Sequence, residues 1–254
     1  MDLQLSTSSV ANTVGEDGYH QWVAHNVPLL SKLQKRKRKA WAVQRKYEDW
    51  SNVIWSDECY VHMDDSWGRG FVMRRADEIF EEDCLIPSFK QSPTRVMVWG
   101  CMMKGKKGPL VVLEYPGGRG GGMNARRYQE QVLEGKLLEF YQEIDSERGD
   151  IKFQHDGAPS HTAKSTKKWL SDHGIPLFPH PPSSPDLNPI EPVWHELKHG
   201  VRARPCHPTS VPSLIEAVKE VWEGITVETI DKYAGRMDEV VKAVLDAEGG
   251  HTRY

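Results

Sequence analysis

Two aspartates in this sequence, Asp57 and Asp156, each come one residue after a short, mainly apolar run and could together bind a metal ion. Asp57 follows the run 53–55, and Asp156 follows the run 151–154 and then turns at once through glycine and proline. If these runs are neighbouring strands, both carboxylates emerge at the same edge of a sheet. Mg²⁺ prefers a few hard oxygen ligands and fills the rest of its octahedron with water or phosphate oxygens. Two aspartates at adjacent strand ends meet this requirement.

Glu191 is the third candidate ligand, in the segment SSPDLNPIEPVWHELKHG. Asn188 is a suitable helix N-cap, Pro189 suits the first helical position, and Glu191 falls three residues after the cap, which is the geometry of a capping box. From this motif alone, a capping role and a metal-binding role for Glu191 both remain open. Asp186, nearby, could bind metal or cap the turn.

Other roles are also open for the two aspartates and the histidines around them. Aspartates at strand ends often stabilise turns. His155 and His161 flank Asp156. A zinc site completed by His173 or His180 is an alternative, but the irregular spacing and the lack of nearby cysteines disfavour it. We expect His161 instead to begin the following helix or to hydrogen-bond a neighbouring carboxylate.

The elements that must position these residues begin with strands. Short β-type runs at 53–55 and 59–62 lie on either side of Asp57, and stronger ones at 96–103 and 110–115 are separated by a turn of lysine and glycine. These runs predict an antiparallel meander. Helix and strand then alternate before helices finish the chain, so we predict a mixed α/β fold with one central sheet flanked by helices.

The second half of the chain supplies most of the predicted helices. Apolar residues with helical spacing predict a helix from about residue 124 with one buried face, formed by Tyr128, Val132, Leu137, Tyr141 and Ile144. The glycine run 117–122 lacks the lysine and serine of a phosphate-binding P-loop and is interpreted as a flexible turn. The other expected elements are strands at 151–154 and 175–178, and helices at about 162–172, from Pro189, at about 210–224 and at about 227–246.

Composition indicates a globular protein with an uneven distribution of charge. The 254 residues are 38% hydrophobic, which is enough for a packed core, and the net charge of -3 gives no overall sign of nucleic-acid binding. Residues 31–47, however, contain eight lysines and arginines and no acid. Such a block is typical of a nuclear-import signal, a phosphate-contacting arm or a solvated helix face. If this block contacts nucleic acid, the residues expected at its phosphates are Lys35, Arg36, Lys37, Arg38 and Lys39.

A secretory signal peptide, a membrane-spanning run and close cysteine pairs are missing from the sequence. No apolar run near the N-terminus resembles a signal peptide, and no stretch approaches the roughly 20 apolar residues that span a bilayer. The four cysteines are scattered without a close pair, which argues against a zinc module, a redox motif or a disulfide framework. We therefore expect no membrane association, no secretion and a reducing compartment.

Three segments together resemble the signature segments of Tc/mariner-type DNA transposases, in the order found in that family. They are VIWSDE (53–58), FQHDGAPSHTA (153–163) and HPPSSPDLNPIEPVWHELK (180–198). The 34 residues between Asp156 and Glu191 match the branch whose Asp-Asp-Glu triad ends in glutamate. Further matches extend the resemblance over about residues 28–254. They are PLLSKLQKRKRKAW, VMVWGCM, GPLVVLE, MNARRY and the terminal GGHTRY.

The resemblance implies an RNase H-like catalytic fold that binds two Mg²⁺ or Mn²⁺ ions. It also implies DNA transposition and integration, in which transposon ends are cut by hydrolysis and then joined to target DNA. Carried over by motif, Asp57 and Asp156 would share the metals and Glu191 would hold the second, with His161 and Asn188 in supporting roles. The implied partner is DNA, both transposon ends and target, and the expected location is the nucleus.

The resemblance also divides the chain into three parts. Residues 1–50 would be a remnant of a second helix-turn-helix module with a basic linker, 51–204 the catalytic core, and 205–254 helices packed on that core. Within the core, a clamp-type loop at about 64–92 corresponds in position to a segment that reaches the partner subunit in relatives, so we expect a homodimer. Full-length relatives begin with two helix-turn-helix modules, and we expect a truncated N-terminus here. An alternative function is therefore a catalytically inactive, transposon-derived DNA-binding or interaction protein.

Overall fold

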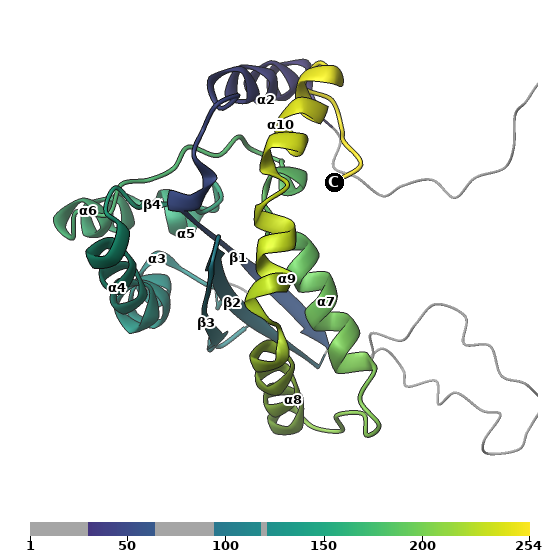
Figure 1. Cartoon of the computed structure of the whole chain (residues 1–254). Coiled ribbons are helices and arrows are strands. Elements are labelled where there is room, and N and C mark those ends of the chain that lie inside the picture. Colours follow the sequence, from purple (N-terminus) through teal and green to yellow (C-terminus); the bar gives the residue numbers. More distant parts are fainter. Residues whose placement is uncertain (1–29, 64–93, 118–120) are drawn as a thin grey trace, which may run out of the picture.

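A computed structural model describes residues 30–63, 94–117 and 121–254 of the protein, and a four-stranded sheet lies at its centre (Figure 1). The strand order is β3-β2-β1-β4. Strands β1, β2 and β3 form an antiparallel meander, and β4 pairs in parallel with β1. The predicted mixed sheet is thus confirmed. The strands are β1 (Val53–His62), β2 (Arg95–Met103), β3 (Lys106–Leu113) and β4 (Lys152–Phe153).

Strand β1 runs without a break through Asp57, so the expectation of two short strands on either side of this residue was wrong. Asp57 lies opposite Gly100 and Glu58 opposite Trp99 in the antiparallel register with β2. The polar residues do not end the strand because the β2 backbone supplies partners from Trp55 to His62. Successive side chains of a strand alternate between the two faces of a sheet, so Asp57 and Glu58 project to opposite faces.

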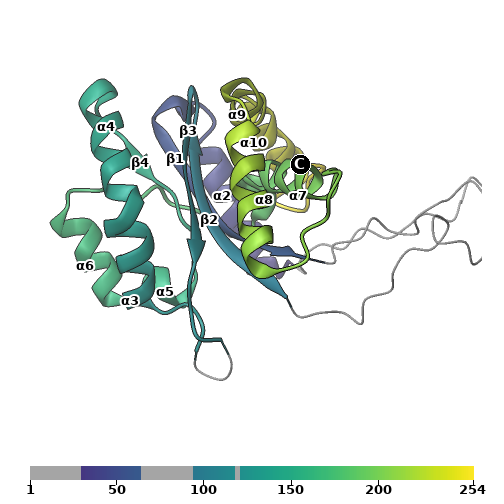
Figure 2. The ribbon, with the colours of Figure 1, turned by 90° about the horizontal axis from the view of Figure 1, so that it is seen from below.

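Helices cover both faces of the sheet (Figure 2). One face carries α3 (Ala125–Tyr128), the π-helical segment η3 (Gln129–Leu137), α4 (Leu138–Arg148), α5 (Pro159–Thr162) and α6 (Lys164–Asp172). The opposite face carries α7 (Glu191–Arg202), α8 (Val211–Gly224), α9 (Val227–Ala234) and α10 (Met237–Asp246), and α2 (Lys32–Gln44) packs against α10. The 3-10 turns η1 (Trp50–Asn52) and η4 (Pro185–Leu187) complete the described elements.

Alternating residues of β1 supply two separate hydrophobic cores. Trp55 packs with residues of α7 to α10, whereas Ile54 packs with residues of α3, η3 and α4. Both side chains are fully buried, so a shift of the register by one residue would exchange the two cores. The buried face predicted for the first long helix is confirmed, since all five of its apolar residues are buried: Tyr128, Val132, Leu137, Tyr141 and Ile144.

Several expected boundaries in the second half of the chain need correction. The helix expected at 227–246 is divided into α9 and α10, because Gly235 caps the end of α9. The strand expected at 175–178 is reduced to one parallel bridge, between Phe153 and Leu177. The helix expected at 162–172 begins with α5 and restarts as α6 after an extended residue, Ala163.

Three parts of the sequence prediction lie outside the described residues. They are the start of the expected N-terminal remnant, residues 1–29, the expected clamp-type loop at 64–92, and half of the glycine run, 118–120. Among the residues that the structure describes, no helix has the length and apolarity needed to cross a bilayer.

Candidate active site

Asp57, Asp156 and Glu191 line one cavity of about 410 Å³. Asp57 comes from the middle of β1, Asp156 follows β4, and Glu191 begins α7. The parallel pairing of β4 with the start of β1 leads both strands toward the same edge, which is the geometry that the sequence predicted. The cavity therefore collects three carboxylates from segments that are far apart in the chain.

A buried junction at Ser56 ties these three segments together. The Ser56 backbone N–H donates to Gln154 Oε1 at 3.1 Å, and its hydroxyl donates to the Gln154 carbonyl at 2.8 Å. Asn188 Nδ2 donates to the Ser56 carbonyl at 3.1 Å. All three residues are buried, and each lies within three positions of one of the carboxylates. The junction thus sets the spacing between the three acids.

The expected capping box at the start of α7 is not formed. The N-cap position of this helix is Ile190, and no side chain caps it. Asn188 uses its amide nitrogen on β1, and its Oδ1 accepts from the Ile190 N–H at 3.4 Å. Pro189 accordingly precedes the helix instead of beginning it. Because Glu191 does not cap the helix, capping gives no structural reason for a glutamate at this position.

The cavity gathers acidic side chains, of which Asp57 and Glu191 are partly buried and Asp156 is exposed. Burial raises the pKa of Asp57 to about 8, and the charges of Glu191, Glu58 and Asp156 add to that rise. Burial also raises the pKa of Glu191, against the effect of a hydrogen bond with Asp57. A cation would remove the repulsion between these acids. Carboxylate oxygens are the ligands that Mg²⁺ and Mn²⁺ prefer, so the residues present fit such an ion.

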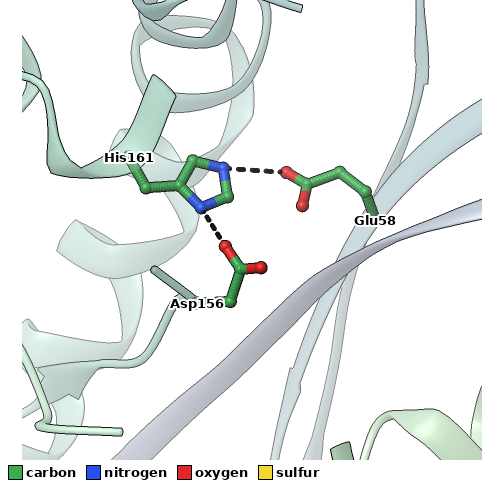
Figure 3. A group of neighbouring side chains, drawn as sticks. All are labelled: Glu58, Asp156 and His161. Carbon is green, nitrogen blue, oxygen red and sulfur yellow. Dashed lines mark hydrogen bonds and ion pairs between the residues drawn. The ribbon is translucent and has the colours of Figure 1, made fainter. Parts of the chain in front are cut away.

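His161 lies beside this cavity and contacts two acids (Figure 3). Its Nδ1 is 2.6 Å from Asp156 Oδ1, and its Nε2 is 3.2 Å from Glu58 Oε1. Burial acts to lower the pKa of His161, but the contacts with Asp156 and Glu58 outweigh it and raise the pKa to about 10. The hydrogen bond from His161 in turn lowers the pKa of Asp156. His161 therefore hydrogen-bonds a neighbouring carboxylate, one of the two roles expected for it.

The structure does not support the alternative of a zinc site completed by His173 or His180. Among the described residues, the group with a histidine that is close enough to hold an ion contains Glu58, Asp156 and His161, and neither His173 nor His180 belongs to it. His173 stacks on a tryptophan ring instead, and His180 contacts the carbonyl of Ser184 through Nε2.

Three residues that organise the site were missed by sequence reasoning: Ser56, Gln154 and Glu58. Ser56 and Gln154 interrupt otherwise apolar runs beside the two aspartates, and a polar residue within a buried strand was the available signal. For Glu58 the signal was its position directly after Asp57, which places it on the opposite face of a continuous strand.

Helix α2 carries the basic residues that were expected to contact DNA, outside the cavity. Lys35, Arg36 and Lys37 are exposed and form what we call the basic face of α2. Lys39 is half-buried and pairs with Glu248 at the surface. Helix α2 nevertheless lies near the cavity, because its Gln34 donates to the hydroxyl of Ser183, a lining residue.

Arg38 does not belong to this basic face, so the expectation that it contacts DNA was wrong. Its side chain is fully buried and donates two hydrogen bonds of 2.6 Å to Asp186. It also donates to the carbonyl oxygens of Gly249 and Gly250 at 3.0 and 2.9 Å. Arg38 and Asp186 thus join α2, the loop before α7 and the C-terminal segment. Both carboxylate oxygens of Asp186 accept hydrogen bonds from Arg38, so its main role here is this ion pair.

Comparisons with known proteins agree with this arrangement. A family model described as DDE superfamily endonuclease matches residues 52–210, which contain all three carboxylates. The Tcb1 transposase of Caenorhabditis briggsae is 30% identical over 269 residues, which cover 100% of this chain and 93% of that protein.

Solved structures of the Mos1 mariner transposase, a protein of Drosophila mauritiana, have a similar fold. Its paired end complex with Mn matches with a TM-score of 0.75 at 20% identity, over 99% of this chain and 73% of that one. Its strand transfer complex matches with a TM-score of 0.74 at 21% identity, over 98% of this chain and 72% of that one. At this identity the likeness concerns the fold, which is RNase H-like.

Proposed function

The chain belongs to the DDE superfamily endonucleases and, within them, to the Tc/mariner-type transposases, and on this premise we propose which of its residues cut and join DNA. As a transposase it is an enzyme of DNA cleavage and strand transfer. We assign the metal-binding, catalytic role to Asp57, Asp156 and Glu191. The observation that carries this assignment is their meeting in one cavity, from three distant segments of the matched region, in an order and spacing typical of an Asp-Asp-Glu triad.

The metal is Mg²⁺ or Mn²⁺, and we propose that two ions are bound. Paired end complexes of the Mos1 transposase with Mn and with Mg are known, which supports this choice of metals. Asp57 lines the same cavity as Glu191 and Asp156, and we assign it the sharing of the two ions. When bound, such ions lower the pKa of an attacking water or 3′-hydroxyl and stabilise the leaving oxygen of an in-line displacement.

The chain itself contributes rigid placement of the ligands. The Ser56 junction keeps Asp57 and Asp156 at a set distance, and the hydrogen bond from Asn188 attaches the start of α7 to the same strand. Glu191 is therefore held in the first turn of a helix, in line with the supporting role expected for Asn188. Such preorganisation matters because phosphoryl-transfer catalysis depends on positioning and on charge stabilisation.

We further propose that the protein acts as a homodimer on transposon-end and target DNA in the nucleus. The basic face of α2 supports the DNA contact, since lysines and arginines neutralise phosphates without reading sequence. A Mos1 transposase complex with a left transposon end is known, and it supports transposon-end DNA as the partner. The basic block 31–47 supports nuclear import.

The test is nicking of supercoiled plasmid with Mg²⁺ or Mn²⁺, for the protein and for Asp156→Asn. We expect metal-dependent nicking that the substitution abolishes while folding, followed by circular dichroism, stays unchanged. The matched control is Asp150→Asn, the same change at an exposed residue before β4. Nicking by Asp156→Asn would remove Asp156 from the site. No nicking and no Mn²⁺ binding by the unmodified protein would favour the alternative, a transposon-derived DNA-binding protein without activity.

A further inference from the structure

Glu58, the acid directly after Asp57, has no role in the proposed triad. We infer that Glu58 is a positioning residue: together with His161 it holds Asp156 by one carboxylate oxygen and so determines which oxygen is left for the metal. We call these two residues the Glu58–His161 pair. The inference deepens the proposed function and rests on the metal-binding role of Asp156.

The Glu58–His161 pair lies on the other side of the sheet from Glu191. Asp57 projects to the same face as Trp55, toward α7, whereas Glu58 projects to the same face as Ile54, toward α3 and α5. The cavity that contains the three catalytic acids is lined by neither Glu58 nor His161. Asp156 can be reached from both sides because it follows the two-residue strand β4. The pair therefore contacts Asp156 from the face of the sheet opposite to Glu191.

The imidazole ring of His161 is buried and has four neighbouring groups. It is only 2% exposed and contacts two neighbouring rings, with the Tyr128 centroid at 4.2 Å and the parallel His155 ring at 4.9 Å. Both of its ring nitrogens face acids (Figure 3). Such a ring has no alternative orientation of equal energy, so a displacement of Glu58 is transmitted to the ring and then to Asp156.

One oxygen of Asp156 is fully engaged by this arrangement. Oδ1 accepts from His161 Nδ1 at 2.6 Å and from the Ala158 backbone N–H at 2.9 Å. Oδ2 makes neither of these contacts, and in Figure 3 it points away from the imidazole. Partners that orient metal-binding carboxylates in this way typically change metal affinity 10- to 100-fold when they are removed.

A different interpretation of the same residues is that they bind a metal themselves. Ligand atoms of Glu58, Asp156 and His161 lie within 4.8 Å of one another. The two acids, however, contact different nitrogens of the ring, Nε2 and Nδ1. Both ring nitrogens are already in contact with an acid, so an ion could bind His161 only by taking the place of one of these contacts. The contacts are instead those of a chain of three groups, in which His161 hydrogen-bonds Asp156 through Nδ1 and lies in ion-pair contact with Glu58 through Nε2.

The test compares Glu58→Gln with Glu58→Ala by Mn²⁺ affinity, read from the electron paramagnetic resonance of free Mn²⁺. For the alanine variant we expect Mn²⁺ binding at least tenfold weaker. For the glutamine variant we expect most of the affinity to return, because an amide can accept from a protonated Nε2 or donate to an unprotonated one. Equal losses in both variants would mean that Glu58 acts through its charge or as a ligand, and no loss in alanine would mean that it has no role.

Controls separate this inference from the proposed function and from a general loss of folding. Glu48→Ala is matched, because its side chain is 11% exposed against 12% for Glu58 and pairs with Lys152 and Arg45 away from the cavity. It should leave Mn²⁺ affinity unchanged. If Asp156→Asn loses Mn²⁺ binding and Glu58→Ala does not, only the positioning role fails. If Asp156→Asn binds normally, the proposed function fails. Should the alanine variant not fold, Glu58→Met removes the partner while filling its volume, and the same comparison applies.

Discussion

Replacing Arg38 with methionine tests whether this residue is structural or contacts DNA. The substitution keeps an apolar stem in place and removes the charged group that binds Asp186 and two backbone carbonyls. Removing one partner of a buried ion pair costs about 3–5 kcal/mol, because the other charge is left without compensation. Asp186 is 12% exposed and retains a hydrogen bond from Thr252 at 2.9 Å, so the lower end, about 3 kcal/mol, is expected.

The assay is equilibrium unfolding in urea of the unmodified protein, Arg38→Met and the control Arg36→Met. Arg36 is on the same helix but exposed, so its replacement should change the free energy of unfolding by less than about 0.5 kcal/mol. A loss below about 1 kcal/mol for Arg38→Met, accompanied by weaker DNA binding, would refute the reasoning and restore Arg38 to the basic face.

Three further predictions follow from the same geometry. In the metal-free protein, burial and neighbouring acids raise the pKa of Asp57 from 3.8 to about 8, so this group makes the free energy of unfolding fall as pH rises from 4 to 8. Asp57→Asn should make this fall with pH smaller in urea titrations with EDTA. An unchanged pH dependence would contradict the burial of the Asp57 charge. Gly249→Ala should destabilise the protein by about 2 kcal/mol or more in thermal unfolding, because Gly249 has φ +82° and an added Cβ would lie 2.0 Å from the Lys35 carbonyl oxygen. A stability equal to that of the unmodified protein would show that the C-terminal segment is not packed against Lys35. Replacing all three residues of the basic face of α2 by glutamine should make the slope of log K for DNA binding against log salt concentration less steep by roughly 2–3 in filter binding, if each residue contacts one phosphate. An unchanged slope would assign this face to nuclear import.

Much of the site was predictable because its signals are local. The two aspartates beside apolar runs and the glutamate at a helix start can be found from residue type, period and spacing, and so can the layered α/β fold. The buried face of the first long helix was equally visible, because helical packing repeats every three or four residues.

The partners of the polar groups could only be found in the tertiary structure. Arg38 and Asp186 are 148 positions apart, Asn188 and Ser56 are 132 apart, and Ser56 and Gln154 are 98 apart. In the sequence, Arg38 has the same surroundings as its exposed basic neighbours, and Asn188 has those of a helix cap. Local sequence determines which conformations a segment prefers, but the choice of hydrogen-bond partner depends on which distant segments the packed cores bring together. For that reason the sequence by itself determined the three acids and the layered fold, and only the tertiary structure decided which side chains hold those acids in place.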